Sequence, residues 1–381
     1  MQRKRQVAII YKSLPQYRRR FFELLRERLH QQGVELVLVY GQAGSKDAAK
    51  RDTVHLPWAH RIDNTIVKFA GRELYWQPCL RHIKGADLVI AEQASKLLIN
   101  YFLQLLHLSG VKKFAFWGHG KNFQAHEGSR AGELVKRMVS NKVHWWFTYN
   151  EMSSAVVREL GFPEDRITNV QNSIDTRALI AARQRVGEAQ ISSLKQGLGI
   201  AGDNVCVFSS SMYREKRLGF LIDACLLVKE QVPDFHMIFI GAGPDDHIVS
   251  AASKKHPWLH YVGPQFDDNK VPYFAVAKLL LMPGLVGLGV LDAFALGVPL
   301  VTTDLPYHSP EIEYLKNWGN GVVVENSEDP VAYAAAVVSL LNDERLREKL
   351  VAGCLESAAS YTVEEMVERF AAGVLKALER K

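Results

Sequence analysis

Residues 278–303 read KLLLMPGLVGLGVLDAFALGVPLVTT. The apolar run at the start predicts a buried strand, glycines follow at its carboxyl end, and VLDAFAL predicts a helix that Gly297 and Pro299 terminate. The run VPLVTT predicts the next strand. A strand, a helix and another strand in this order are typical of a parallel sheet that helices cover on both faces.

The same alternation of strand and helix patterns continues on both sides of a polar stretch of low periodicity at residues 176–203. Because parallel strands alternate with covering helices, we predict an α/β protein with two Rossmann-like, doubly wound domains that face a cleft. The predicted domains are residues 1–180 and 181–360, and the helical pattern at 361–381 is predicted to cross back to the first domain. The predicted strands are QVAIIY, VELVLVY, ADLVIAE, KFAFWG, HWWFTYN and ITNVQN in the first half, and NVCVFSS, FHMIFIG, LHYVG, KLLLMPG, VPLVTT and GVVVE in the second.

Length and composition fit this prediction. A chain of 381 residues is long enough for about two domains, and 48% hydrophobic with 23% charged residues is typical of a soluble enzyme. Its apolar runs are too short for a membrane helix, and the basic start MQRKRQ is unlike a signal peptide. We expect a cytoplasmic protein, with peripheral binding to the inner face of the membrane as an extension. The four cysteines lack C-x-x-C spacing, which favours reduced structural thiols over a metal site.

The net charge of +6 and the pI near 9 favour anionic partners. The sequence has no zinc-ligand pattern and no RNA-binding aromatic motif, so nucleic acid is not a predicted partner. Residues 55–84, HLPWAHRIDNTIVKFAGRELYWQPCLRHIK, interleave aromatic and basic side chains. This mixture suits an anionic membrane surface, and it equally suits aromatic rings that face a core beneath a solvated basic face.

The glycine-rich loop after the strand at 278–283 is a candidate phosphate site. A loop with few side chains at a helix N-terminus lets backbone N–H groups approach a phosphate, and the helix dipole favours the negative charge. Asp292 lies in the first turn, where its carboxylate can accept hydrogen bonds from a ribose. The alternative is that the glycines make a tight turn and that Asp292 is a favourable N-terminal charge. The first strand lacks a following G-x-G-x-x-G, which argues against NAD.

The first half has its own candidate site in FWGHGKNFQ, where a strand ends and His119 lies between two glycines, followed by Lys121 and Asn122. A histidine at the carboxyl end of a strand is well placed for function, although a lone histidine is more often an ordinary hydrogen-bonded residue. Arg18 follows the first strand in LPQYRRRFF and is a candidate contact for phosphate or acceptor.

These motifs resemble family 4 of the retaining glycosyltransferases, which have the GT-B fold, and the likeness covers nearly the whole chain. The family has two carboxylates, separated by seven residues, before A-x-x-x-G-x-P. Here PGLVGLGVLDAFALGVP matches Asp292 to the second acid, which the resemblance implies binds the ribose of the donor, while Gly284 occupies the position of the first. The backbone amides of Leu285, Val286 and Gly287 are then expected to hold the diphosphate.

The same resemblance assigns other site residues. In SSMYREKRLGFLIDA, Lys216 matches the family lysine that contacts the donor phosphates. Ser211 occupies the position of the family arginine, so Arg214 would supply the second cation. His119 matches a histidine that faces the reacting sugar. Two further residues are matched to the cleft, Asn172 in VQNSID and Glu311 in LPYHSPEIEYLKNWGNG.

The resemblance implies a metal-independent, retaining hexosyltransferase of the bacterial polysaccharide or lipopolysaccharide type, with no cofactor. Its donor would be a UDP- or GDP-sugar and its acceptor a glycan or a lipid-linked glycan. Three alternatives stay open: a nucleotide-sugar epimerase of the same fold, a phosphorylase, and a catalytically impaired, membrane-associated binding protein. The last is favoured by the departures from the family pattern at Gly284 and Ser211.

Overall fold

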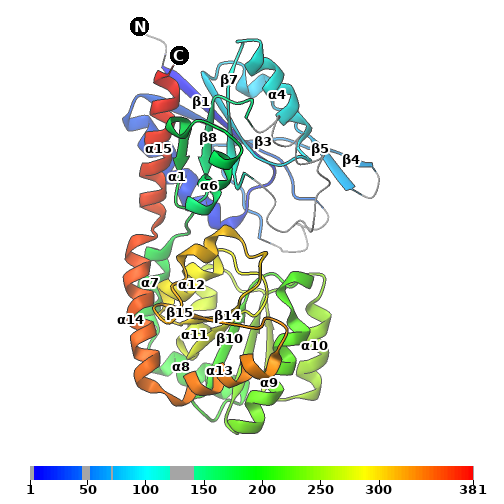
Figure 1. The fold of residues 1–381 in the computed structure, drawn as a ribbon, viewed down its shortest axis with the longest axis vertical. Coiled ribbons are helices and arrows are strands. Elements are labelled where there is room, and N and C mark those ends of the chain that lie inside the picture. Colours follow the sequence, from blue (N-terminus) through cyan, green and yellow to red (C-terminus); the bar gives the residue numbers. More distant parts are fainter. Residues whose placement is uncertain (1–3, 45–51, 70–71, 121–140, 381) are drawn as a thin grey trace. The chain divides into compact units, whose positions relative to one another are not determined.

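The computed structural model describes residues 4–44, 52–69, 72–120 and 141–380, which form two compact units (Figure 1). Of the described residues, unit 1 contains 4–44, those between 52 and 174, and 363–380. Unit 2 contains Asp175–Thr362. Each unit has a parallel sheet covered by helices, so the predicted pair of Rossmann-like α/β domains is confirmed.

The sheet of unit 1 has seven strands in the order β3-β2-β1-β6-β7-β8-β9, and every pair is parallel. The chain runs outward from β1 to one side and from β6 to the other, so the order reverses between these two strands. Candidate site residues of this unit therefore follow the carboxyl ends of neighbouring strands. The strands are β1 (Arg5–Tyr11), β2 (Val34–Tyr40), β3 (His60–Arg61), β6 (Leu88–Glu92), β7 (Lys113–Gly118), β8 (Trp145–Thr148) and β9 (Ile167–Asn169).

Helices complete unit 1, and the last of them comes from the end of the chain. Helix α15 (Val363–Glu379) lies against α1 (Arg19–Gln31), where the ring centroids of Phe370 and Phe21 are 5.4 Å apart. A Cβ on Gly373 would lie 2.8 Å from the ring of Phe147 on β8, so α15 approaches the sheet very closely. The other helices are η1 (Gln16–Arg18), α3 (Leu80–Ile83), α4 (Leu98–Leu108), α6 (Glu151–Glu159) and η2 (Glu164–Arg166).

An antiparallel hairpin, β4 (Thr65–Phe69) and β5 (Arg72–Trp76), lies within the segment that interleaves aromatic and basic residues. The sequence patterns did not predict it. Two aromatic rings of this segment face inward. Tyr75 on β5 is buried, and Trp58 packs against the core with the guanidinium of Arg26 4.7 Å from its ring. For these two rings the structure favours the interpretation as core-facing aromatics.

The sheet of unit 2 has six parallel strands in the order β12-β11-β10-β13-β14-β15. Strands β11 and β13 flank β10 on opposite sides, so the order reverses between β10 and β13. The strands are β10 (Val205–Ser209), β11 (His236–Ile240), β12 (Leu259–Gly263), β13 (Leu279–Leu281), β14 (Leu300–Thr303) and β15 (Gly321–Val324). The covering elements are η3 (Arg214–Lys216), α9 (Leu218–Gln231), α10 (Asp246–Lys255), η4 (Asp267–Lys270), α11 (Val271–Ala275), α12 (Gly289–Leu296), η5 (Pro310–Tyr314), α13 (Pro330–Asn342) and α14 (Glu344–Ser360).

The polar stretch of low periodicity, residues 176–203, forms two helices, α7 (Thr176–Arg185) and α8 (Glu188–Leu198). Asp175 caps α7, since its carboxylate accepts a hydrogen bond from the amide of Ala178 at 2.9 Å. Gly199 ends α8 in the left-handed conformation, with φ of 68°. Local capping thus makes helices that hydrophobic periodicity did not reveal.

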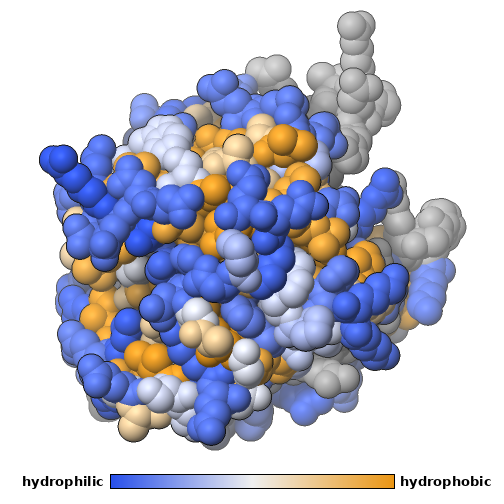
Figure 2. All heavy atoms as spheres, turned by 90° about the horizontal axis from the view of Figure 1, so that it is seen from below, coloured by the Kyte–Doolittle hydropathy of each residue, from blue (hydrophilic) through white to orange (hydrophobic). Residues whose placement is uncertain are grey.

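Figure 2 shows that hydrophilic residues cover most of the face seen from below, with hydrophobic ones between them.

Candidate functional site

Two loops meet where the strand order of unit 2 reverses. One loop follows β10 and contains η3, and the other follows β13 and leads to α12. A Cβ on Gly289, the first residue of α12, would lie 3.8 Å from the carbonyl oxygen of Ser209 at the end of β10. In open α/β sheets this reversal point is the usual place for a ligand.

Gly284 allows the two loops to touch. A Cβ at this position would lie 2.4 Å from the carbonyl oxygen of Glu215 and 2.5 Å from that of Lys216. Next to it, the amide of Leu285 donates to the Glu215 carbonyl at 2.8 Å. The glycine that replaces the family's first acid is therefore required by backbone packing, and this position has no room for a side chain.

Lys216 also links the two loops, through its side chain. Its side chain is buried at 4% exposure, and its ammonium donates to the carbonyl oxygen of Leu285 at 2.6 Å. The ammonium also lies 5.3 Å from the ring centroid of Tyr213. The Lys216 side chain thus bridges the two loops.

His308, which the sequence patterns did not indicate, fixes the glycine loop to β14. Its Nδ1 accepts from the amide of Val286 at 3.0 Å, and its Nε2 lies 2.7 Å from the carbonyl oxygen of Thr303. Because Nδ1 accepts, the proton is on Nε2, which donates to Thr303. The Val286 amide is thus occupied by this histidine and is not available to a ligand.

The bridge through His308 predicts a dependence on pH. Burial lowers the pKa of His308 below its ordinary value of 6.5. The folded protein binds fewer protons here than the unfolded chain, so the stabilisation is complete above pH 6.5 and is lost as the pH falls toward the lowered pKa. We expect nucleotide affinity and the midpoint of thermal unfolding to fall as the pH drops below 6.5. A His308→Gln variant should show a flatter pH profile, and an unchanged profile would contradict this role.

The start of α12 presents backbone donors. The amides of Gly287, Leu288 and Gly289 have no hydrogen-bond acceptor within the described residues, and these three residues are partly exposed although their neighbours on both sides are buried. No side chain caps the helix. Exposed amides at the positive end of a helix dipole are suited to bind an anion such as a phosphate.

Asp292 lies in the first turn of this helix, as predicted, and it is buried. Its Oδ1 accepts from the ammonium of Lys270 at 2.6 Å, and both side chains are mostly shielded from water. The ion pair fixes the carboxylate within the first turn of α12. Lys270 was not predicted, because it lies in η4, 22 residues earlier in the chain.

The remaining predicted residues of unit 2 surround the same loops. Arg214 is exposed at the start of η3, and Ser211 is half-buried in the loop after β10. Glu311 is buried in η5. Two residues before it, the amide of Ser309 donates to the carbonyl oxygen of Val286 at 3.0 Å. The fold thus brings the predicted donor residues of unit 2 to one edge of its sheet.

In unit 1, His119 follows β7 at the carboxyl edge of the sheet, as predicted. Its ring centroid lies 4.3 Å from that of Tyr149. Close packing leaves no room for a side chain at the two flanking glycines. A Cβ on Gly118 would lie 2.8 Å from Gln93, and one on Gly120, where φ is +78°, would lie 2.9 Å from Val157. Lys121 and Asn122 lie outside the described residues.

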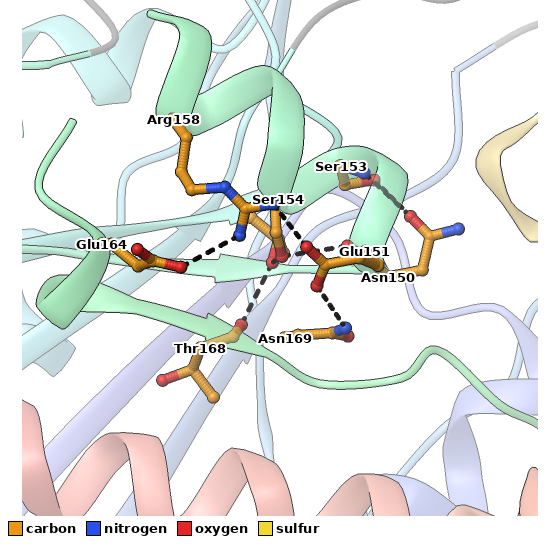
Figure 3. Close-up of polar contacts among 9 residues, drawn as sticks. Asn150, Glu151, Ser153, Ser154, Arg158, Glu164, Thr168 and Asn169 are labelled. Atoms are coloured by element: carbon orange, nitrogen blue, oxygen red, sulfur yellow. Dashed lines mark hydrogen bonds and ion pairs between the residues drawn. The ribbon is translucent and has the colours of Figure 1, made fainter. Parts of the chain in front are cut away.

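A polar network positions the loop that contains Tyr149 (Figure 3). Asn150 caps α6 through its Oδ1, which accepts from the amide of Ser153 at 3.0 Å. Glu151 in the first turn accepts from Arg158 and, at 3.4 Å, from Asn169. The network joins α6 to the end of β9 and holds the loop beside His119.

Arg18 and Asn172 lie together, but inside unit 1. The guanidinium of Arg18 donates to Oδ1 of Asn172 at 2.6 Å and lies 5.1 Å from the ring of Trp117. Both residues are buried, and the Arg18 guanidinium also lies 3.6 Å from the sulfur of Met366 on α15. In this arrangement the pair ties α15 to the sheet, and a contact of either residue with substrate stays a prediction.

The described residues contain no group of three His, Cys, Asp or Glu side chains arranged to hold a metal ion. No helix among them has the length and apolar character to cross a membrane.

Part of unit 2 is similar in sequence to known glycosyltransferases. Residues 203–343 match the family described as Glycosyl transferases group 1. This match and the relatives below support a family 4-like glycosyltransferase. The chain is 26% identical over 198 residues to the phosphatidyl-myo-inositol mannosyltransferase of Mycobacterium leprae, a match that covers 50% of this chain and 49% of that one. It is 22% identical over 173 residues to the GtfA subunit of the UDP-N-acetylglucosamine–peptide N-acetylglucosaminyltransferase of Streptococcus pneumoniae, with 43% and 34% covered. The chain spans between a third and about half of the length of the curated relatives it matches.

Comparison with solved structures shows that this chain has the GT-B fold. A glycosyltransferase from Rickettsia africae matches 99% of the chain over 100% of its own length, with a TM-score of 0.72 and 13% identity. Anabaena Alr3699/HepE in complex with UDP-glucose matches 97% of the chain over 99% of its own, with a TM-score of 0.70 and 14% identity.

Proposed function

We propose that the chain transfers a sugar from a nucleoside diphosphate sugar to a glycan or lipid-linked acceptor. The observation that carries this proposal is the junction of two loops at the reversal point of unit 2, where exposed amides of α12, the buried Lys216 and the buried Asp292 surround one edge of the sheet. The similar GT-B structure solved with UDP-glucose supports a UDP-sugar as the first donor to test.

Each of these groups has a different role in the proposed reaction. The amides of residues 287–289 and the dipole of α12 hold the diphosphate. The charge of Lys216 offsets the negative charge that grows on the departing diphosphate, and the exposed Arg214 adds a second cation from the same turn. Asp292 accepts from the ribose hydroxyls. We propose that the acceptor binds at the carboxyl edge of the unit 1 sheet, beside His119, and that the sugar keeps its anomeric configuration.

Donor and acceptor requirements test the proposal. A panel of UDP- and GDP-sugars is screened by thermal shift, and each donor that binds is then incubated with and without an acceptor glycan or glycolipid. A transferase forms a new glycoside only with acceptor, whereas an epimerase converts the donor alone and a binding protein does neither. We propose that catalysis needs no metal, so full activity should remain in EDTA, and magnesium-restored inhibition by EDTA would contradict this.

Asp292→Asn is expected to weaken nucleotide binding about tenfold to a hundredfold. The amide offers one acceptor oxygen where the carboxylate offers two, and a hydrogen bond to a charged group contributes about 1.5–3 kcal/mol. Calorimetric titration with the nucleoside diphosphate measures the loss.

Lys270→Met is the matched variant, because it removes the other half of the ion pair and keeps the ribose acceptor. It should weaken nucleotide binding less than Asp292→Asn does. If both variants lose the same affinity, or if Asp292→Asn loses none while remaining folded, Asp292 serves the ion pair and the helix N-terminus instead.

The net charge of the chain supports one class of acceptor. With a net charge of +6, the protein is suited to a lipid-linked acceptor at an anionic membrane, which would place it in bacterial cell-surface polysaccharide or lipopolysaccharide synthesis. Activity on a glycolipid should then rise when the acceptor is presented in vesicles with anionic lipid.

A further inference from the structure

Helix α4 exposes apolar side chains on its outer face. Leu105 is 65% exposed, Leu108 is 57% exposed, and Val111, just beyond the helix, is 65% exposed. Tyr101 and Phe102 are exposed one turn earlier. The spacing of three to four residues puts the four side chains on the helix on one face, and Val111 follows the end of the helix. We call these five residues the α4 outer face.

The opposite side of α4 is also apolar, because Ile99 and Leu103 are buried in the core of unit 1. A helix that is apolar on both sides is normally buried on both sides. Single exposed apolar residues are ordinary on a protein surface, but four on one face of a helix, followed by a fifth just beyond it, mark an interaction site.

Positive charge surrounds the α4 outer face. The sequence has no Asp or Glu between Glu92 and Glu127. Lys96 is exposed just before the helix. At the other end, the ammonium of Lys112 donates to the carbonyl oxygens of Lys84 at 3.1 Å and Ala86 at 2.7 Å, which brings the exposed Lys84 close to Val111.

The β4–β5 hairpin extends this surface. The ring centroid of Trp76 on β5 lies 6.4 Å from that of Phe102 on α4, in an edge-to-face arrangement. Val67 on β4 and Leu80 at the start of α3 are exposed as well. Figure 1 shows α4 and the hairpin next to each other in unit 1.

We propose that the α4 outer face docks on an anionic membrane surface. Apolar side chains enter the headgroup region while Lys84, Lys96 and Lys112 contact anionic lipid. The charge favours this occupant over a second copy of the chain, because two copies that met through this face would bring their lysines together. The inference deepens the proposed function by placing the lipid side of the acceptor at unit 1, but it uses none of the donor residues.

Sedimentation with vesicles tests the docking. The wild type should pellet with vesicles that contain phosphatidylglycerol and not with pure phosphatidylcholine, and salt should release it because charges are screened beyond about 10 Å at 0.1 M. The triple variant Leu105→Ser, Leu108→Ser and Val111→Ser should lose at least tenfold in vesicle affinity. The control variant Val331→Ser with Leu355→Ser removes two exposed apolar residues of unit 2 and should bind as the wild type does.

Nucleotide thermal shift and light scattering complete the test. The triple variant should keep the thermal shift with nucleoside diphosphate, so a failure of docking is separate from a failure of donor binding. The triple and control variants pelleting equally well would overturn the proposal. The proposal would also be overturned if the wild type formed a dimer and did not bind vesicles while the triple variant was a monomer. That result would assign the face to a second copy of the chain.

Discussion

Gly284→Ala is expected to destabilise unit 2 and to abolish nucleotide binding. The new methyl group would lie within 2.5 Å of the backbone oxygens of Glu215 and Lys216, so the two loops must separate. Overpacking of this kind costs about 1–3 kcal/mol, and rigid backbone neighbours place it near the upper end. Separation also breaks the hydrogen bond from Leu285 to Glu215. Thermal unfolding and calorimetric titration with the nucleoside diphosphate measure both effects.

Gly287→Ala is the matched control. A Cβ there would meet only the side chain of Ser309, at 3.6 Å, which is ordinary van der Waals contact. The variant should unfold at nearly the wild-type temperature. Gly284→Glu, which restores the family's first acid in sequence, should be as damaging as alanine or more so. Wild-type stability and nucleotide affinity in Gly284→Ala would show that the loops do not pack as described.

Lys216→Met is expected to lower kcat about a hundredfold or more, with a smaller change in KM for the donor. A preorganised charge that meets developing charge in the transition state contributes about this much. The change also leaves the buried carbonyl oxygen of Leu285 without its lysine donor, so a loss of about 1–3 kcal/mol in unfolding free energy should accompany it. Steady-state kinetics and thermal unfolding separate the two effects.

Arg217→Gln is the control for Lys216, because it removes a cation from the next residue in the chain. The Arg217 guanidinium points elsewhere, donating to the carbonyl oxygen of Ser327 at 2.6 Å and pairing with Glu328 at 3.1 Å. Its loss should lower stability and leave kcat close to the wild-type value. A Lys216→Met variant that raises only KM would indicate that the ammonium binds substrate and transition state equally.

The order of strands and helices, the glycine loop and the place of Asp292 could all be predicted from the sequence. These features depend on neighbours within a few residues: apolar runs predict buried strands, and Gly297 with Pro299 ends α12 where expected. Alternation then leads to parallel sheets, and parallel sheets bring strand ends to one edge. Local patterns failed at the hairpin β4–β5 and at α7 and α8, where strand pairing and capping decided the structure.

Contacts between distant residues were decided only by the tertiary structure. Lys270 reaches Asp292 and His308 reaches Val286, in each case across 22 residues, and no local pattern encodes either pair. The close approach of two backbones explains Gly284, which in the sequence is only a departure from the family. Burial of Tyr75 and exposure of Leu105 likewise depend on what packs over each side chain, because hydrophobicity indicates that a residue favours burial but not whether the fold covers it.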